Sequence, residues 1–287
     1  MDHRVVLPVV AIIILLAGIA IVAMRLNAKA CNKEAYMEVA MLTKIPVVVI
    51  NLQRNVERLH RISRQFKECD LSDGRDIIRV SAIDGLLIDT SEYVNSHGKN
   101  QLEHLKRTGH RTRHHHLSTG AVGCYLSHIS IMRSLIIDAS NDMYIVFEDD
   151  ADIPQKLARH ITRTLRDIES TSLHSSWDMI IMGHHYVESS PVDKDNAHIH
   201  QVKWFLGSHA IILHKRGAEK VVDFYNKNGI SMQIDSLLSV LAKRGDLNVA
   251  MDDRYFIDFT GDFTDIQHPV MHSSGVDPFE IEHDIHP

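Results

Sequence analysis

Four carboxylates stand within five residues, directly after a compact apolar run. The run is Met143-Tyr-Ile-Val-Phe147, and the carboxylates are Glu148, Asp149, Asp150 and Asp152. Adjacent carboxylates that are partly removed from water repel one another unless a cation neutralises them. Hard divalent ions such as Mg²⁺ and Mn²⁺ accept carboxylate oxygens and also bind diphosphates, offsetting the charge on a departing nucleotide. The cluster therefore favours metal-assisted chemistry on a nucleotide diphosphate, and the alternative is a solvated acidic turn that caps the next helix.

Three segments near the start of the soluble region predict the elements that position such a cluster. Ile45 to Leu52 is apolar and β-branched at consecutive positions, as in a strand covered on both faces. Arg54 to Phe66 has apolar residues every three or four positions, which predicts a helix with one buried face. Ile77 to Ile83 predicts a second strand that ends in the turn Asp84-Gly85. Strand, helix and strand form the unit of an α/β sheet, in which ligands bind at the ends of the strands.

The segment that follows changes in character. Leu86 to Leu117 is polar and rich in His, Lys, Arg and Gly without sustained periodicity, so we expect a long excursion with at most a short helix. Ser118 can cap the next helix, whose apolar residues recur at helical spacing up to Ile137. This helix leads directly to the strand that carries the acidic cluster.

The N-terminal segment predicts a membrane anchor. Val5 to Met24 is twenty residues without a charge, which as a helix spans roughly 30 Å, the thickness of a bilayer core. The alternative is a cleaved signal peptide, since Ala28-Lys29-Ala30 resembles a cleavage site. Basic residues after the span weakly favour a cytosolic catalytic domain, whereas anchored sugar transferases are usually lumenal, and the side of the membrane stays open. The expected organisation is anchor 1–24, stem 25–44, catalytic domain 45–270 and tail 271–287.

Composition excludes some classes of function. The 287 residues carry a formal net charge of −6, so no general basic surface attracts nucleic acid. The three cysteines, Cys31, Cys69 and Cys124, are too scattered for a disulfide framework or a paired-cysteine zinc site, and we expect them to pack. The histidine cluster from His114 to His116 predicts a solvated loop rather than a metal site.

Several ordered sequence blocks carry a resemblance to a known family. They are Val49-Ile-Asn-Leu with Arg54 and Arg58, Ala82-Ile-Asp-Gly85, Leu117-Ser-Thr-Gly120 with Gly123-Cys-Tyr-Leu-Ser-His128, Val146-Phe-Glu-Asp-Asp150, Trp177-Asp-Met-Ile-Ile-Met-Gly183, Gly207-Ser-His-Ala210 with Arg216-Gly-Ala-Glu219, and Gln233-Ile-Asp235. In their order and spacing the chain, from Ile45 to about Gln267, resembles the family 25 glycosyltransferases, which include bacterial lipooligosaccharide galactosyltransferases and the collagen galactosyltransferases. The resemblance implies a GT-A-like fold with a mixed, largely parallel sheet. It also implies a UDP-sugar donor, often carrying galactose, and a bound Mn²⁺ or Mg²⁺.

The resemblance also assigns residues. Glu148 and Asp150 match the metal-binding positions, with Asp149 alongside and Asp152 as an extra candidate. The residues expected around the nucleotide-sugar are Asn51, Arg54, Arg58, Asp84, Ser127, Gly183 and Gly207. The chain departs from the family pattern where Ala121 replaces a usual glutamate, where Ile131 and Met132 replace an aromatic residue, and where Ser236 follows Asp235 in place of an aromatic residue. These departures concern the identity of the acceptor more than the chemistry.

Five residues allow two interpretations each. Asp235 is either the general base that takes the proton of the acceptor hydroxyl or the N-cap of a helix. His128 either contacts a ligand or packs in its helix. Gly183 and Gly207 either allow close backbone approach to a ligand or serve turns. His268 either completes a metal shell or lies in a surface tail.

The main hypothesis is metal-dependent hexosyl transfer from a UDP-sugar, most simply UDP-galactose, to a hydroxyl on a glycan, a lipooligosaccharide or a hydroxylated protein. A second hypothesis is a membrane-linked carbohydrate- or partner-binding module that has lost catalysis, which the departure at Ala121 would suit. A metal-dependent phosphohydrolase or nucleotidyl enzyme would also use clustered carboxylates, but it does not explain the other blocks.

Overall fold

The computed structural model describes residues 44–71, 77–113, 115–194 and 196–261. The predicted anchor, nearly all of the stem, His268 and the tail lie outside these ranges, so those expectations stay predictions. By its contacts the chain divides into Met1–Lys44 and Ile45–Pro287, and the architecture below is that of the second unit.

A single eight-stranded sheet, in the order β2-β1-β3-β7-β4-β8-β6-β5, forms the centre of the described unit. The strands are β1 (Val47–Asn51), β2 (Ile77–Ser81), β3 (Met143–Glu148), β4 (Met179–Gly183), β5 (Tyr186–Pro191), β6 (Ile199–Leu206), β7 (Ala210–His214) and β8 (Val249–Asp252). Pairing is parallel between β1 and β2, β1 and β3, and β4 and β8, whereas β7 and β6 are antiparallel to both of their neighbours. Six strands therefore share one direction, which confirms the predicted mixed, largely parallel sheet.

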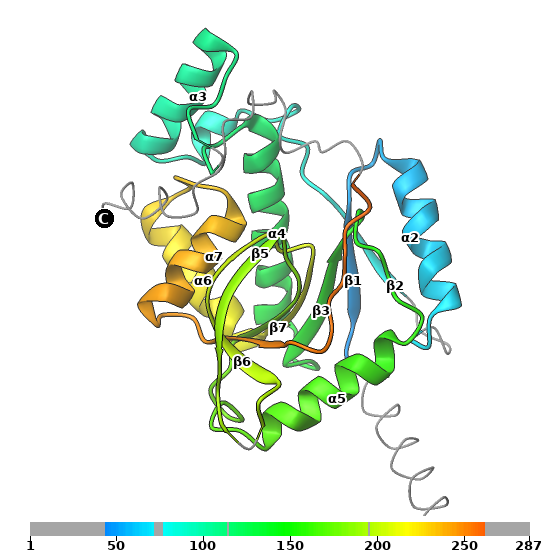
Figure 1. Cartoon of the computed structure of the whole chain (residues 1–287). Coiled ribbons are helices and arrows are strands. Elements are labelled where there is room, and N and C mark those ends of the chain that lie inside the picture. Colours follow the sequence, from blue (N-terminus) through cyan, green and yellow to red (C-terminus); the bar gives the residue numbers. More distant parts are fainter. Residues whose placement is uncertain (1–43, 72–76, 114, 195, 262–287) are drawn as a thin grey trace, which may run out of the picture. The chain divides into compact units, whose positions relative to one another are not determined.

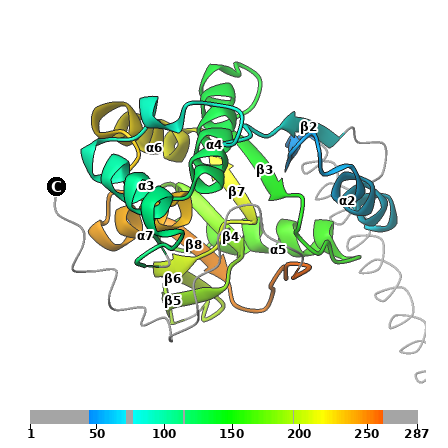
Figure 2. The same cartoon turned by 90° about the horizontal axis from the view of Figure 1, so that it is seen from above.

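Helices cover both faces of the sheet (Figures 1 and 2). The helices of the described residues are α2 (Val56–Glu68), α3 (Ser96–Thr108), α4 (Thr119–Ile137), α5 (Leu157–Glu169), α6 (Lys215–Asn228) and α7 (Ile234–Arg244), with a short 3₁₀ helix, η1 (Thr90–Glu92), and all but α3 and η1 lie over the sheet. On one face, α4, α6 and α7 share a hydrophobic core with alternate strand residues such as Val48, Ile50 and Val146. On the other face lie α2 and α5, where the ring of Phe66 meets Phe147 edge-on at 5.2 Å. Because β1 and β3 are covered on both sides, their residues are apolar at consecutive positions.

Helix α4 is the central helix of the larger core. It begins as predicted at Ser118, whose side chain accepts a hydrogen bond from the Ala121 N–H, and it ends at Ile137. Within the described residues it alone is long and apolar enough to cross a membrane by length and composition. However, 61% of its most apolar window is buried inside the protein, as expected for a core helix.

The prediction of at most a short helix between Leu86 and Leu117 is wrong, because α3 runs for 13 residues within it. Asn95 caps its start by accepting from the Gly98 N–H, and Gly109 ends it in the left-handed conformation. The helix lacks a broad apolar face, so hydrophobic periodicity could not reveal it. Its buried Gln101 donates to the Ser231 carbonyl and accepts from the Leu117 N–H, and Leu102 packs against the hydrophobic core.

Candidate active site

A cavity of about 290 Å³ lies where the carboxyl ends of β1 and β3 meet the start of α4. Parallel strands bring their carboxyl ends to one edge of a sheet, the usual place for a ligand in α/β folds. Seven of the predicted site residues line this cavity, namely Arg54, Arg58, Asp84, Ser127, Glu148, Asp149 and Asp150. The wall also contains Ile50, Leu52, Asn55, Ala82, Ile83, Gly85, Leu86, Thr119, Gly120 and Cys124. The structure therefore brings most of the predicted residues together around one space.

The Asp150 carboxylate is the least satisfied polar group of the cavity. Its Oδ1 atom is buried and has no hydrogen-bond partner among the described residues. Burial raises the pKa of Asp150 to about 7, with a further contribution from the negative charge of Glu148. A carboxylate held near a like charge without a donor to balance it is stabilised by a cation. The donor set of Asp150 and Glu148 thus fits a hard divalent ion such as Mg²⁺ or Mn²⁺.

Two side chains donate hydrogen bonds to the Asp149 carboxylate. The Asn51 amide donates to one carboxylate oxygen at 2.6 Å, and the Arg58 guanidinium donates to the other at 3.1 Å. Burial nevertheless leaves the pKa of Asp149 raised, because desolvation outweighs both donors. Asn51 is only 1% exposed and also accepts a hydrogen bond from Arg79. Its polar atoms are engaged within the protein, so Asn51 positions Asp149 and does not reach the cavity as we expected from the sequence.

Two glycines let the loop after β2 lie directly on α4. A Cβ atom on Gly85 would come within 1.8 Å of the Thr119 carbonyl oxygen. A Cβ atom on Gly123 would lie 2.4 Å from the Ile83 carbonyl oxygen. The Ser127 hydroxyl completes the contact by accepting from the Ile83 N–H and donating to the Gly123 carbonyl. Ser127 therefore joins the loop to the helix, and its hydroxyl is already used where we expected a ligand contact.

Arg54 is the second cation on the cavity wall. It forms an ion pair with Asp84, and its side chain remains 40% exposed. Asp84 in turn accepts a hydrogen bond from the Leu86 N–H and so shapes the turn after β2. Arg54 and Arg58 place two guanidinium groups beside the carboxylates on the cavity wall. An anionic ligand such as a diphosphate would meet them together with the first turn of α4.

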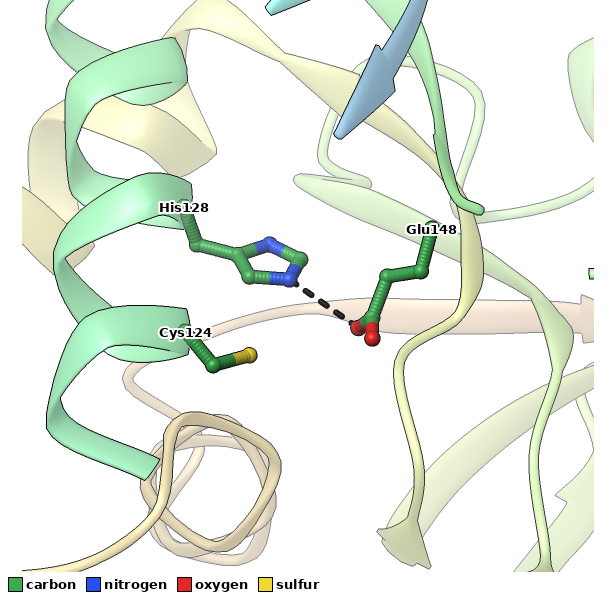
Figure 3. Close-up of side chains that lie close together, drawn as sticks. All are labelled: Cys124, His128 and Glu148. Carbon is green, nitrogen blue, oxygen red and sulfur yellow. Dashed lines mark hydrogen bonds and ion pairs between the residues drawn. The ribbon is translucent and has the colours of Figure 1, made fainter. Parts of the chain in front are cut away.

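His128 faces Glu148 from α4 (Figure 3), and it is not among the residues that line the cavity. Its ring is 2% exposed, and its Nε2 is 3.1 Å from Glu148 Oε1. Burial opposes ionisation of Glu148, but the hydrogen bond and positive potential of His128, with smaller contributions from His209 and His185, leave the Glu148 pKa below its usual value. The geometry gives His128 a positioning role towards Glu148.

Asp235 lies in the first turn of α7 and is not its N-cap, a position that Gln233 occupies. One carboxylate oxygen accepts from the Gly207 N–H at 2.9 Å, and the other accepts from the Ser236 N–H at 2.7 Å. The cavity lining does not include Asp235, but its charge raises the pKa of Cys124, which does line the cavity. Gly207 has φ 86°, so the turn that presents its N–H requires glycine.

The two predicted glycine contacts with a ligand are contacts within the protein. A Cβ atom on Gly183 would lie 2.3 Å from the His209 ring, and one on Gly207 would lie 2.7 Å from the His185 ring. Both glycines therefore make room for imidazole rings of the protein itself. Asp152 is exposed and accepts from Gln65 of α2, which places it outside the cavity.

Sequence reasoning missed two residues at Glu148. Cys124 lies one turn before His128 on α4, and its sulfur belongs with His128 and Glu148 to a group of potential metal ligands. Ser208 directs its hydroxyl towards Glu148 Oε1 at 3.4 Å. The spacing of Cys124 and His128, four residues apart in a helix, could have indicated a shared face. Cys69, in contrast, is buried against Phe66, as the prediction of a packing role requires.

Comparison with known proteins decides the family. The model for "Glycosyltransferase family 25 (LPS biosynthesis protein)" matches residues 44–238. The chain belongs to glycosyltransferase family 25. Among its relatives, it is 25% identical over 201 residues to procollagen galactosyltransferase 2 of Mus musculus, covering 68% of this chain and 30% of the relative. It is 26% identical over 182 residues to procollagen galactosyltransferase 1 of Danio rerio, covering 61% and 28%.

A third family 25 relative is named as inactive. This chain is 31% identical over 137 residues to the inactive glycosyltransferase 25 family member 3 of Homo sapiens, covering 48% of this chain and 21% of the relative. The chain thus spans about 30% or less of the length of the relatives it matches. Membership of family 25 confirms the resemblance that the sequence blocks carried.

Proposed function

We propose that this family 25 chain is a metal-dependent glycosyltransferase that moves a hexose from a UDP-sugar to an acceptor hydroxyl. The observation that carries the proposal is the buried, unpartnered Oδ1 of Asp150 beside Glu148 on the wall of the cavity. A solvated acidic turn would instead expose its carboxylates to water, as Asp152 does. The proposal retains galactose as the hexose, in line with the names of two relatives.

The donor diphosphate would lie between the carboxylates and the cationic wall. Glu148 and Asp150 would hold Mn²⁺ or Mg²⁺, with Asp149 alongside, and the ion would offset the charge that develops on the departing UDP. Arg54 and Arg58 donate hydrogen bonds suited to phosphate oxygens. The N–H groups of the first turn of α4, at Thr119 and Gly120 on the cavity wall, are also suited to an anion.

The acceptor hydroxyl must lose a proton as it attacks the sugar carbon. Asp235 is the proposed general base, held by the N–H groups of Gly207 and Ser236 and near enough to Cys124 for its charge to raise the pKa of that thiol. These hydrogen bonds fix the carboxylate without removing its remaining acceptor capacity. The proposed acceptor is a hydroxyl on a glycan, a lipooligosaccharide or a hydroxylated protein, and membrane attachment through residues 1–24 is part of the same proposal.

A catalytically degenerate binding module is the alternative. The human relative described above is named inactive, and Ala121 stands where the family pattern has a glutamate. In the structure Ala121 is 1% exposed in the first turn of α4, so it offers no polar group to the cavity. The acidic cluster argues against loss of catalysis, because three closely spaced carboxylates on a cavity wall serve no packing purpose.

The experiment is a screen of UDP-sugars with the purified full chain, with Mn²⁺ and with a chelator. We expect Mn²⁺-dependent release of UDP from one donor, lost in Asp150→Asn and retained in Asp152→Asn, the matched change outside the cavity. Tight donor binding without turnover in every case would support the binding module instead. Turnover that is unaffected by the chelator would exclude the proposed metal dependence.

A further inference from the structure

Cys124, His128 and Glu148 form a second set of ligand atoms that shares Glu148 with the acidic cluster (Figure 3). Cys124 and His128 project from the same face of α4, because residues four apart lie one turn from each other. Glu148 faces them from the end of β3. One sulfur, one imidazole nitrogen and one carboxylate oxygen lie within 4.8 Å of one another. Two groups on a helix and one at the end of a strand therefore surround a common point.

The distances suit an ion with short bonds to sulfur and nitrogen. A tetrahedral ion about 2.0–2.3 Å from each ligand separates the ligand atoms by roughly 3.5–4 Å. The present separations of at most 4.8 Å need shifts of about 1 Å, within the reach of side-chain rotation. His128 Nε2 and Glu148 Oε1 are already 3.1 Å apart. Three protein ligands would leave a fourth position open towards the cavity that Cys124 and Glu148 line.

The donor chemistry differs from that of the acidic cluster. Glu148, Asp149 and Asp150 offer only oxygen, which suits Mg²⁺ and Mn²⁺. A thiolate and an imidazole prefer borderline-soft ions such as Zn²⁺ and Co²⁺. Glu148 is shared by both sets, so one ion that draws its carboxylate towards His128 removes it from the other set.

Charge around the thiol also favours a cation. Burial raises the pKa of Cys124 well above its usual value, and the negative charges of Glu148 and Asp235 raise it further. A divalent ion reverses this effect: the sulfur–hydrogen bond breaks, a sulfur–metal bond forms, and the proton passes to solvent.

We propose that Cys124, His128 and Glu148 bind a borderline-soft divalent ion of the Zn²⁺ class. This ion inhibits the enzyme because it draws Glu148 away from the acidic cluster that would hold Mn²⁺ or Mg²⁺. Binding of the ion depends only on Cys124, His128 and Glu148. Its inhibitory effect rests on the proposed function, because it needs Mn²⁺-dependent transfer to act upon.

Titration of the metal-free full chain with Co²⁺ tests the site directly, since a cysteine thiolate bound to Co²⁺ gives a charge-transfer absorption band in the near ultraviolet. We expect the band to appear with one equivalent of Co²⁺, to disappear when Zn²⁺ is added, and to be absent in Cys124→Ser. Cys69→Ser and Cys31→Ser are the matched controls and should retain it. His128→Gln should weaken Co²⁺ binding by about 10-fold or more. A folded Cys124→Ser chain that retains the band, or a wild-type chain without one, would overturn the proposed site.

A second measurement separates the inhibition from the proposed function. Zn²⁺ is added to the Mn²⁺-dependent release of UDP, and each variant is compared with its own rate in Mn²⁺ alone. We expect Zn²⁺ to inhibit the wild-type chain, and Cys124→Ser to need at least 10-fold more Zn²⁺ for the same fractional loss. Equal sensitivity of both chains would overturn the inhibitory role. Absence of any Mn²⁺-dependent release, with the Co²⁺ band present, would overturn the proposed function and leave the metal site intact.

Discussion

Replacement of Asp150 by asparagine should stabilise the metal-free protein, although it removes a proposed ligand. The pKa of Asp150 rises from 3.8 to about 7 on folding, mainly because the carboxyl is buried. A folded state that holds the proton more tightly loses stability as pH rises between these two values, and the loss is complete above pH 7. At about 1.4 kcal/mol for each tenfold change, the loss has an upper limit of about 4 kcal/mol. Partial exposure of the side chain reduces it, and we expect about 1–2 kcal/mol.

The assay is thermal unfolding of the full chain in a chelator at pH 8 and at pH 5. For a domain of this size, 1–2 kcal/mol corresponds to a rise in Tm of about 2–8 °C at pH 8. At pH 5 the folded carboxyl is protonated, so the difference in Tm between Asp150→Asn and the wild-type chain should fall to less than half of its value at pH 8. Asp152→Asn, an exposed change in the same loop, should leave Tm within about 1 °C at both pH values.

Addition of Mn²⁺ should reverse the order of the two proteins. An ion that binds only the folded state raises the stability of the wild-type chain, and it should raise that of Asp150→Asn much less. A variant that is less stable than wild type in the chelator at pH 8 would refute the reasoning, since Asp150 would then be a satisfied group.

Three further predictions concern the groups around the carboxylates. Gly123→Ala should lower the free energy of unfolding by about 1–3 kcal/mol, measured by chemical denaturation, because the new methyl group would meet the backbone of the loop after β2; an unchanged midpoint would show that the loop can move away. Asn51→Leu should weaken binding of UDP in the presence of Mn²⁺ by about 10-fold in calorimetry, since Asp149 loses a 2.6 Å donor, and unaltered affinity would contradict its positioning role. Asp235→Asn should reduce transfer by at least 100-fold while donor binding persists. Unchanged turnover would exclude Asp235 as the base.

The sequence predicted those parts of the fold in which the apolar residues along the chain are the residues that become buried. β1 and β3 are buried on both faces, so their consecutive apolar residues identified them and placed the acidic cluster at a strand end. Helix α3 lacks such a signal, because it is attached through the buried Gln101 and through Leu102 and has no apolar stripe. Pattern alone also could not reveal that β7 lies reversed between β3 and β4, since strand order depends on the whole chain.

Site residues were predicted better as a group than in their individual roles. The carboxylates from Glu148 to Asp150 do share a cavity wall, as their position after β3 suggested. Asn51 and Ser127, expected at the ligand, instead have their polar atoms engaged by neighbouring protein groups. Residue type and spacing place a side chain near a site, but only the folded arrangement tells which of its hydrogen bonds remain available. Cys124 was missed for the same reason, because its partner Glu148 comes from another element.

Calorimetric titration of the full chain with Mn²⁺, in the absence and presence of UDP, tests the central claim most directly. We expect one ion per chain, bound at least 10-fold more tightly when UDP is present. Asp150→Asn should abolish this coupling, and Asp152→Asn should preserve it. Binding of UDP with the same affinity in a chelator as in Mn²⁺, in the wild-type chain and in Asp150→Asn, would show that the carboxylates do not join a cation to the diphosphate.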